Sequence, residues 1–310
     1  GEKVQRDKLE NGAILVRVAK SHIRVGTFQF GSLLKKKIDF EKLISYTIER
    51  LYPEIKNNNN KYLIFFKKIC ETQINLIIHW MRVGFIHGVM NTDNMSLSGE
   101  TIDYGPCAFM DSYNPKTVFS SIDINGRYAF ENQFKIGMWN LARFAETFIY
   151  LIDKNEKNSI KIIENILLEY QKIFQDAWLS MMCKKLNLEV NNSNSKIVNE
   201  FLDIMHIYKL DYTNSFIKLE NNNLESKIFN SWLEKYKSCK LKNYDNYNPV
   251  IIPRNHVIEK IISETNNGNH INLNEFNNLI KQPYNKELIN NKYTNPPNEN
   301  EKVYQTYCGT

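Results

Sequence analysis

The chain has 310 residues, a formal net charge of +6, 42% hydrophobic residues and 12% aromatic residues, so it can bury a sizeable core as one large domain or two smaller ones. No apolar run approaches the roughly 20 residues that cross a bilayer, and the lysines are spread along the sequence instead of gathering with aromatic residues in one stripe. We therefore expect neither a membrane nor a nucleic acid as a partner. The five cysteines form no Cys-x-x-Cys pair, which argues against a disulfide scaffold or a zinc site and favours a reducing compartment.

The N-terminal part of the chain is predicted to contain an extended region and two helices. Dense apolar and β-branched residues indicate short extended structure with turns over residues 11–30. Apolar residues at helical spacing predict a helix over residues 39–51 and a longer one over residues 61–83. Gly84 and Gly88 break the second helix, so the segment that follows is expected to be a loop.

The rest of the chain is expected to alternate irregular segments with helices. Residues 85–106 are predicted to form a loop with a short strand pair around 95–97 and 101–102, and residues 107–135 lack periodicity and resemble an activation segment. The polar residues 286–310 are expected to form a loosely packed tail. Further helices are predicted near residues 136–152, 159–186, 195–208, 224–236, 255–264 and 272–280.

The most informative stretch runs from His87 to Ser96 and leads to the turn Asp103-Tyr104-Gly105. A kinase-type active site needs an Asp near the transferred phosphoryl group, an Asn about five positions later that holds a metal, and a second metal-binding Asp on an Asp-aromatic-Gly turn. Asn94 follows Val89 by five positions, but valine cannot accept a proton, whereas Asp93 stands directly beside Asn94. This arrangement suggests nucleotide chemistry other than ordinary γ-phosphoryl transfer.

Three side chains of this stretch are candidates for the chemistry. Asp103 and Asn94 are predicted to hold a divalent cation that bridges phosphates, one through a carboxylate and the other through a neutral amide oxygen. Asp93 is a candidate proton acceptor for a hydroxyl group, and the alternative is that it forms a turn or caps a helix. His87 is expected to be a packed structural residue rather than a proton shuttle.

Two features outside this stretch leave alternatives open. Arg17 and Arg24 could clamp a phosphate bidentately, although such arginines are more often partners in surface ion pairs. Cys308 is the third residue from the C-terminus, where a thiol is easily exposed and reactive; the alternative is an idle thiol in a tail.

These motifs closely resemble those of the selenoprotein O family, the pseudokinase-fold protein adenylyltransferases. The resemblance rests on residues 17–26, 87–96 and 103–106, and the block 87–96 is highly specific. Matching motifs are spread over nearly the whole chain; the further ones are residues 126–133, 139–141, 253–256, 283–284 and 308–310.

The resemblance implies that the protein transfers AMP from ATP to Ser, Thr or Tyr hydroxyls of protein substrates. In this family ATP is bound flipped relative to kinases, so that its α-phosphate faces the acceptor. Asp93 then corresponds to the proton acceptor, and Asn94 and Asp103 correspond to the ligands of Mg²⁺ (or Mn²⁺), with Asp103 also near the nucleotide. Arg17 and Arg24 correspond to contacts with the nucleotide phosphates.

The resemblance also implies a redox connection and a fold. Cys308 matches the position at which some members carry selenocysteine, and Cys107 is a candidate redox partner for it. The implied fold is mainly α, α+β overall: a protein-kinase-like C-lobe with a small β-hairpin at the catalytic loop, plus a helical C-terminal extension. We expect a catalytic core over residues 1–150, a helical region over 151–285 and the tail over 286–310. Family members occur in bacterial cytoplasm and in mitochondria, so we expect one of these compartments and no secretion.

One departure from the family pattern bears on activity. Family members carry an N-terminal lobe with a glycine-rich loop, a strand lysine and a helix glutamate, and this sequence begins after those elements. We therefore expect the chain, as a fragment, to be weakly active or inactive in isolation. Two alternatives stay open: a protein kinase that transfers the γ-phosphate, which Val89 disfavours, and a non-catalytic nucleotide-binding or interaction module.

Overall fold

A computed structural model describes residues 1–5, 9–34, 36–242 and 246–307 of the chain. The described part is mainly helical, as the sequence predicts, and its strands form two small antiparallel sheets. Within the described residues, no helix combines the length and the apolar character needed to cross a bilayer.

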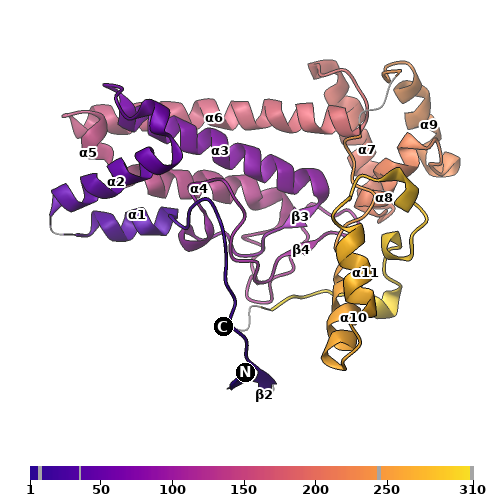
Figure 1. Cartoon of the computed structure of the whole chain (residues 1–310). Coiled ribbons are helices and arrows are strands. Elements are labelled where there is room, and N and C mark those ends of the chain that lie inside the picture. The colour runs from indigo at the N-terminus through magenta and orange to yellow at the C-terminus, as the bar shows by residue number, and fades with distance from the viewer. Residues whose placement is uncertain (6–8, 35, 243–245, 308–310) are drawn as a thin grey trace.

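Three long helices form the centre of the molecule. They are α3 (Lys61–Val83), α4 (Gln133–Glu146) and α6 (Glu156–Lys185), which contact one another and run side by side in Figure 1. Helices α1 (Val25–Ser32), α2 (Lys37–Leu51) and α5 (Ile149–Ile152) lie at one end of this layer. Aromatic rings fill the junction between them: Phe28 contacts Phe65 and Phe144 with ring centroids 6.1 and 4.9 Å away. Burial of such rings supplies much of the driving force for this packing.

Helix α1 corrects the prediction that residues 11–30 are extended. Residues 12–23 carry no helix, but the chain turns helical at Val25. Two reciprocal bonds fix the start: the Thr27 N–H donates to the Arg24 carbonyl at 3.1 Å, and the Arg24 N–H donates to the Thr27 hydroxyl, also at 3.1 Å. Val25 and Phe28, which lie at the end of that range, are buried on one side of the helix.

Strands play a minor part in the described structure. Near the N-terminus, β1 (Lys3–Gln5) pairs with β2 (Leu9–Asn11). In the interior, β3 (Phe85–Ile86) pairs with β4 (Ala108–Phe109), with Phe85 opposite Phe109. This second pair was not predicted, and it closes the base of a long loop. The predicted strand pair around 95–97 and 101–102 is reduced to one bridge between Met95 and Thr101.

The C-terminal half adds helices at the other end of the central layer (Figure 1). Four of them fall close to predicted positions, whereas α8 (Tyr212–Glu220) was not predicted; the others are α7 (Ser195–Ile207), α9 (Ser226–Lys237), α10 (Asn255–Asn266) and α11 (Ile271–Leu279). Short 3₁₀ turns occur at Pro53–Ile55, Thr92–Asn94, Phe130–Asn132, Asn192–Asn194, Lys286–Leu288, Lys292–Thr294 and Glu299–Glu301.

The described part of the expected loosely packed tail, residues 286–307, is largely exposed but is held to the rest of the molecule at two places. Tyr293 and Thr294 are buried, and the Tyr293 ring packs edge-on against Phe276 of α11 with centroids 5.2 Å apart. Further on, the Thr306 N–H donates to the Phe119 carbonyl at 2.7 Å. A polar composition did not reveal this packing because one aromatic ring and a few backbone hydrogen bonds are enough to hold the segment.

Candidate functional site

The loop between β3 and β4 contains a small hairpin whose open end carries the two predicted carboxylates. Met95 pairs with Thr101 in an antiparallel bridge. Asn94 directly precedes Met95 and Asp103 follows Thr101 by two residues, so the bridge joins the two segments that carry the predicted side chains; beyond it, residues 92–94 form a 3₁₀ turn and the pairing does not continue. The hairpin thus brings together residues that the sequence singled out separately.

Asp93 lies against the first turn of α1. The Asp93 N–H donates to the Asn91 side-chain oxygen at 3.0 Å, which makes Asn91 the cap of the 3₁₀ turn Thr92–Asn94. A Cβ atom added to Gly26 would lie 2.2 Å from Asp93 Oδ1, far inside van der Waals contact. The capping role that the sequence left open for Asp93 therefore falls to Asn91, and the carboxylate of Asp93 is held against a glycine of the neighbouring helix.

Asn94 is oriented by its own amide group. Its Nδ2 donates to the Val89 carbonyl at 2.9 Å, and the residue is 8% exposed. An amide whose nitrogen is committed in this way keeps its oxygen as an acceptor for a cation or a donor group. Val89, which occupies the position of a kinase base, takes part through its backbone carbonyl.

Asp103 occupies a strained position beside Arg17. Its φ of 57° lies in the left-handed region, which is uncommon for a residue other than glycine but better tolerated by Asp than by most residues. Arg17 Nη1 approaches Asp103 Oδ1 at 3.3 Å, with the two side chains 53% and 37% exposed. Arg17 thus forms the ion pair that was one of its two predicted roles, and its partner is a candidate metal ligand.

Arg24 is attached to the same hairpin through its backbone. It forms an antiparallel bridge with Ser96, flanked by bonds from the Val25 N–H to the Met95 carbonyl at 3.0 Å and from the Leu97 N–H to the Ile23 carbonyl at 2.9 Å. The side chain is partly buried, and its Nε has no hydrogen-bond partner among the described residues. A buried guanidinium N–H without a partner is costly, so this group is available to an anion.

His87 has the structural role that the sequence predicts. It is fully buried, its Nε2 lies 2.9 Å from the Ile102 carbonyl, and its Nδ1 accepts from the Val89 N–H at 3.4 Å. Burial lowers the pKa of His87, and the acceptor role of Nδ1 requires the neutral ring. The ring therefore joins the start of the loop to the residue that precedes Asp103.

Buried amide side chains of the surrounding helices hold this loop in place, and the sequence analysis gave them no role. Gln73 Nε2 donates to the Ser96 carbonyl at 2.6 Å, and Asn140 Nδ2 donates to the Met90 carbonyl at 2.9 Å. Gln133 accepts from the His87 N–H at 3.1 Å and donates to the Phe85 carbonyl at 3.0 Å. Their signal in the sequence was a polar residue on an apolar helix face, which burial would penalise unless a partner were present.

The C-terminal tail reaches the segment that follows Asp103. Thr306 Oγ1 donates to the Pro106 carbonyl at 2.5 Å, and the same carbonyl faces Gly88, where an added Cβ would lie 2.9 Å from it. Cys107 follows Pro106, and burial raises the pKa of its thiol to about 11. Cys308, the other predicted redox residue, lies outside the described residues.

The donor set fits a cation that arrives with a nucleotide. Among the described residues, no group of three or more His, Cys, Asp or Glu side chains is placed to hold a metal. Magnesium usually needs only one or two protein carboxylates because phosphates and water complete its shell. Asp103, with Asn94 nearby on the hairpin, has this character, and the Arg17 ion pair shows that the site favours charge pairing at Asp103.

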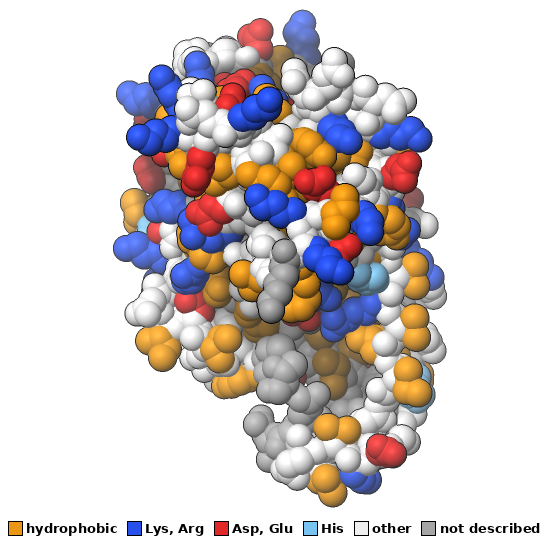
Figure 2. Space-filling model, turned by 90° about the vertical axis from the view of Figure 1, so that its left-hand side faces the viewer, with side chains coloured by type: hydrophobic (Ala, Val, Ile, Leu, Met, Phe, Trp, Pro, Cys, Tyr) orange, Lys and Arg blue, Asp and Glu red, His pale blue; other side chains and the backbone are white. Residues whose placement is uncertain are grey.

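Positive and negative side chains are mixed on one face of the molecule. Figure 2 shows Lys and Arg side chains interspersed with Asp and Glu over one face of the molecule, at the end where α1, α2 and α5 lie. That face carries no continuous basic stripe.

Comparisons with known proteins agree with the geometry. The sequence model of the family described as "Protein adenylyltransferase SelO" matches residues 1–243. The chain is 47% identical to "Protein nucleotidyltransferase YdiU" of Pelagibacter ubique, covering 100% of this chain and 68% of the relative. It is 42% identical to the proteins of the same name from Clostridium perfringens strain SM101 and Brevibacillus brevis, each time covering 100% of this chain and 67% of the relative. The chain therefore belongs to the SelO family of nucleotidyltransferases.

Proposed function

We propose that the protein transfers AMP from ATP to Ser, Thr or Tyr hydroxyl groups of other proteins. The observation that supports this proposal most is the bridge between Met95 and Thr101, which joins the segment that carries Asp93 and Asn94 to the segment that leads to Asp103. The position of a kinase base is held by Val89, whose contribution here is a backbone carbonyl. The names of the relatives, protein nucleotidyltransferase, support the same reaction class.

Each residue has a distinct task in this proposal. Asp93 accepts the proton of the acceptor hydroxyl, because its carboxylate is not occupied by an ion pair among the described residues. Asp103 and the amide oxygen of Asn94 hold Mg²⁺ or Mn²⁺, which when bound neutralises charge on the phosphates of ATP. Arg17 and Arg24 contact the phosphates, so nucleotide binding competes with the ion pair between Arg17 and Asp103.

The kinase-like C-lobe belongs to the same proposal. Its support is the order of elements: the long helix α3, the loop with His87, the hairpin, the Asp103 turn and an irregular segment before α4. The chain spans about two thirds of the length of the relatives it matches. The activity proposed is therefore that of the whole protein.

The experiment that tests this proposal measures which phosphate of ATP becomes bound to protein. The complete open reading frame that encodes this chain is incubated with Mg²⁺ and ATP labelled at either the α- or the γ-phosphate, beside Asp93→Ala and Asp103→Ala. We expect protein-bound α label that both substitutions abolish. Protein-bound γ label would instead make the protein a kinase, and bound ATP without any transfer would make it a nucleotide-binding module.

We also propose that Cys107 and Cys308 form a redox pair. The support is that Thr306, two residues before Cys308, donates to the Pro106 carbonyl next to Cys107. The raised pKa of Cys107 keeps its thiol protonated near neutral pH, so Cys308 would be the attacking thiolate. After treatment with oxidised glutathione, non-reducing peptide mapping should find the two cysteines linked. Linkage of Cys308 to another cysteine would refute the pair.

A further inference from the structure

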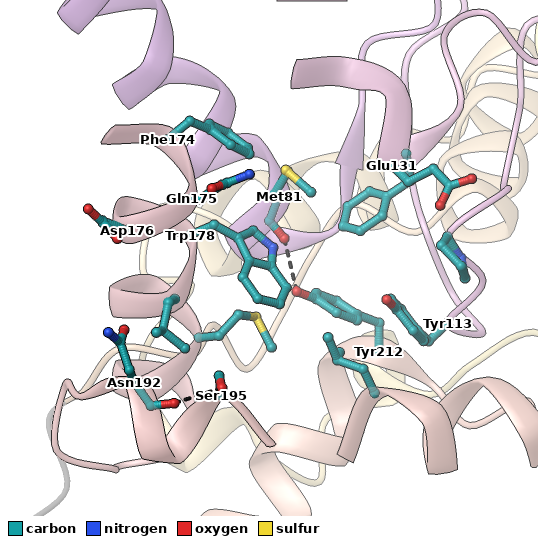
Figure 3. Close-up of a pocket in the computed structure, with 15 residues that line it drawn as sticks. Met81, Tyr113, Glu131, Phe174, Gln175, Asp176, Trp178, Asn192, Ser195 and Tyr212 are labelled. Carbon is teal, nitrogen blue, oxygen red and sulfur yellow. Dashed lines mark hydrogen bonds between the residues drawn. The ribbon is translucent and has the colours of Figure 1, made fainter. Parts of the chain in front are cut away.

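A cavity lies away from the hairpin, and none of the predicted site residues lines it. It is enclosed by the end of α3, the second half of α6, the starts of α7 and α8, and residues 113–131, and its volume is ≈ 560 Å³. A cavity of this size accommodates a small organic molecule. Figure 3 shows that side chains from all these elements converge on it.

Aromatic rings form its walls. Tyr113 and Tyr212 are stacked with centroids 5.7 Å apart, and Phe130 packs edge-on against both. The Tyr212 hydroxyl donates to the Met81 carbonyl at 2.9 Å, so its polar group is already satisfied and the ring is fixed. Trp178 of α6 lies across from the two tyrosines (Figure 3). The walls are therefore built before any ligand arrives, which lowers the entropic cost of binding.

The polar part of the lining carries negative charge. Its charged residues are Glu131 and Asp176, both acidic and both exposed to solvent, and it includes no Lys, Arg or His. Among the described residues, Glu131 has no ion-pair partner, and the Tyr113 hydroxyl has no hydrogen bond. The pKa of Tyr113 is raised to about 12 by burial, and the charges of Asp203 and Glu131 add to that effect. The cavity thus has a negative potential near Tyr113 and Glu131.

We propose that this cavity binds an organic cation, namely an amine or quaternary ammonium attached to a flat or branched apolar group. The apolar part would lie against Trp178 and Phe130, and the cationic part would face the tyrosine rings and Glu131. Aromatic faces attract such cations, and a carboxylate adds a charge-assisted contact. An anionic ligand would meet repulsion without any basic side chain to balance it.

A ligand bound in this cavity would stabilise the segment that follows Asp103. Tyr113 and Glu131 belong to that segment, and its backbone is tied to the start of α8 by bonds from the Tyr113 N–H to the Leu210 carbonyl at 2.8 Å and from the Tyr212 N–H to the Asp111 carbonyl at 2.7 Å. A ligand that bridges Tyr113 and Trp178 would reduce opening of residues 113–131, and hydrogen exchange measures such opening. The proposal is independent of the adenylyl transfer proposed above.

The test is calorimetric titration of the 310-residue chain with benzyltrimethylammonium, with neutral benzyl alcohol and anionic benzoate as comparisons. We expect the cation to bind at least about tenfold more tightly than benzyl alcohol, and Glu131→Gln to weaken it about fivefold. The matched control is Glu169→Gln, because Glu169 is an exposed residue of α6 that does not line the cavity; it should leave the affinity unchanged.

Hydrogen exchange locates the site without any variant. Benzyltrimethylammonium should protect peptides covering residues 113–131 and 174–182 and leave residues 85–105 unchanged. The proposal is overturned by equal affinity for benzyl alcohol, by an unaltered affinity in Glu131→Gln, by protection confined to other segments, or by the absence of heat and protection at about 10 mM ligand, which corresponds to a binding free energy weaker than about 3 kcal/mol.

Discussion

Two arginine–aspartate contacts in this molecule have opposite characters. Arg17 meets Asp103 through one contact of 3.3 Å, and both side chains are substantially exposed. Arg254 has a side chain that is 1% exposed, donates to both oxygens of Asp211 at 2.8 and 3.1 Å, and also bonds to Asp111. The Arg17–Asp103 pair is a single contact exposed to solvent, whereas the Arg254 side chain is buried and bonds to two aspartates.

The difference separates a contact that can change partners from one that holds the fold. An exposed ion pair contributes about 0–1 kcal/mol, so a nucleotide phosphate or a cation can replace it at little cost. The buried cluster joins three segments, with Asp111 just after β4, Asp211 at the cap of α8 and Arg254 at the cap of α10. Burial raises the pKa of Asp111 even though Arg254 opposes that shift, so the Asp111 carboxylate depends on the arginine to stay charged.

The largest effect is expected from removing the buried arginine. Arg254→Met should lower the free energy of unfolding by about 3–5 kcal/mol, because two partly buried carboxylates lose their counter-charge. The matched variant Arg17→Met should lower it by less than about 1 kcal/mol. Urea denaturation followed by circular dichroism measures both. Equal losses in the two variants would remove the distinction between the two contacts.

The open contact should matter for activity instead. Asp103→Asn keeps a residue that tolerates the φ of 57° and removes the charge, so stability should change by less than about 1 kcal/mol. Transfer of α label by the complete protein should fall at least about 100-fold, because the cation and the nucleotide phosphates lose their carboxylate. Undiminished transfer in Asp103→Asn would place the metal elsewhere.

A smaller effect is expected from crowding Asp93. Gly26→Ala places a Cβ atom 2.2 Å from Asp93 Oδ1, so the carboxylate must move. The rate of transfer should fall about tenfold, while alanine in the first turn of α1 leaves stability nearly unchanged. We expect the turnover number to fall and the KM for ATP to stay constant.

A double-mutant comparison tests whether Gly26 acts through Asp93. In an Asp93→Ala background, Gly26→Ala should cause no further loss of transfer, because the group it displaces is already absent. An additive loss would mean that the alanine disturbs the site by another route, such as a shift of α1 against the hairpin.

The sequence predicted the long helices well because their apolar residues repeat at helical spacing. The helix expected over residues 61–83 is found as Lys61–Val83. Helix α8 was missed because polar residues interrupt it, although its buried residues Tyr212, Phe216 and Leu219 have helical spacing. The pair β3–β4 could not be predicted from local pattern, since each strand has two residues and its partner lies far along the chain.

The candidate site likewise has features that the sequence predicted and features that it could not predict. Spacing within the motif singled out Asp93, Asn94 and Asp103, and the bridge between Met95 and Thr101 joins the two segments that carry them. The sequence could not tell which side chain caps the 3₁₀ turn or which carbonyls the buried amides would meet. Those outcomes depend on contacts such as Gln73 with Ser96, which form only when a distant helix packs against the loop.

The smallest expected effect concerns pH and the buried ring of His87. Burial lowers its pKa below the ordinary value of 6.5, so the unfolded chain binds a proton more readily than the folded one. The stability that this residue contributes is therefore fully present above about pH 6.5 and is lost as the pH falls toward the lowered pKa. Protonation of Nδ1 would also cost the acceptor of the Val89 N–H.

Unfolding free energies measured between pH 7 and pH 5 should thus fall by about 1 kcal/mol more in the unsubstituted protein than in His87→Gln. Glutamine retains a donor for the Ile102 carbonyl but does not titrate. His79 and His256, whose pKa values burial also lowers, leave a residual slope in both proteins. An unaltered slope in His87→Gln would mean that the folded and unfolded chains protonate this ring equally, which would contradict the lowered pKa of His87.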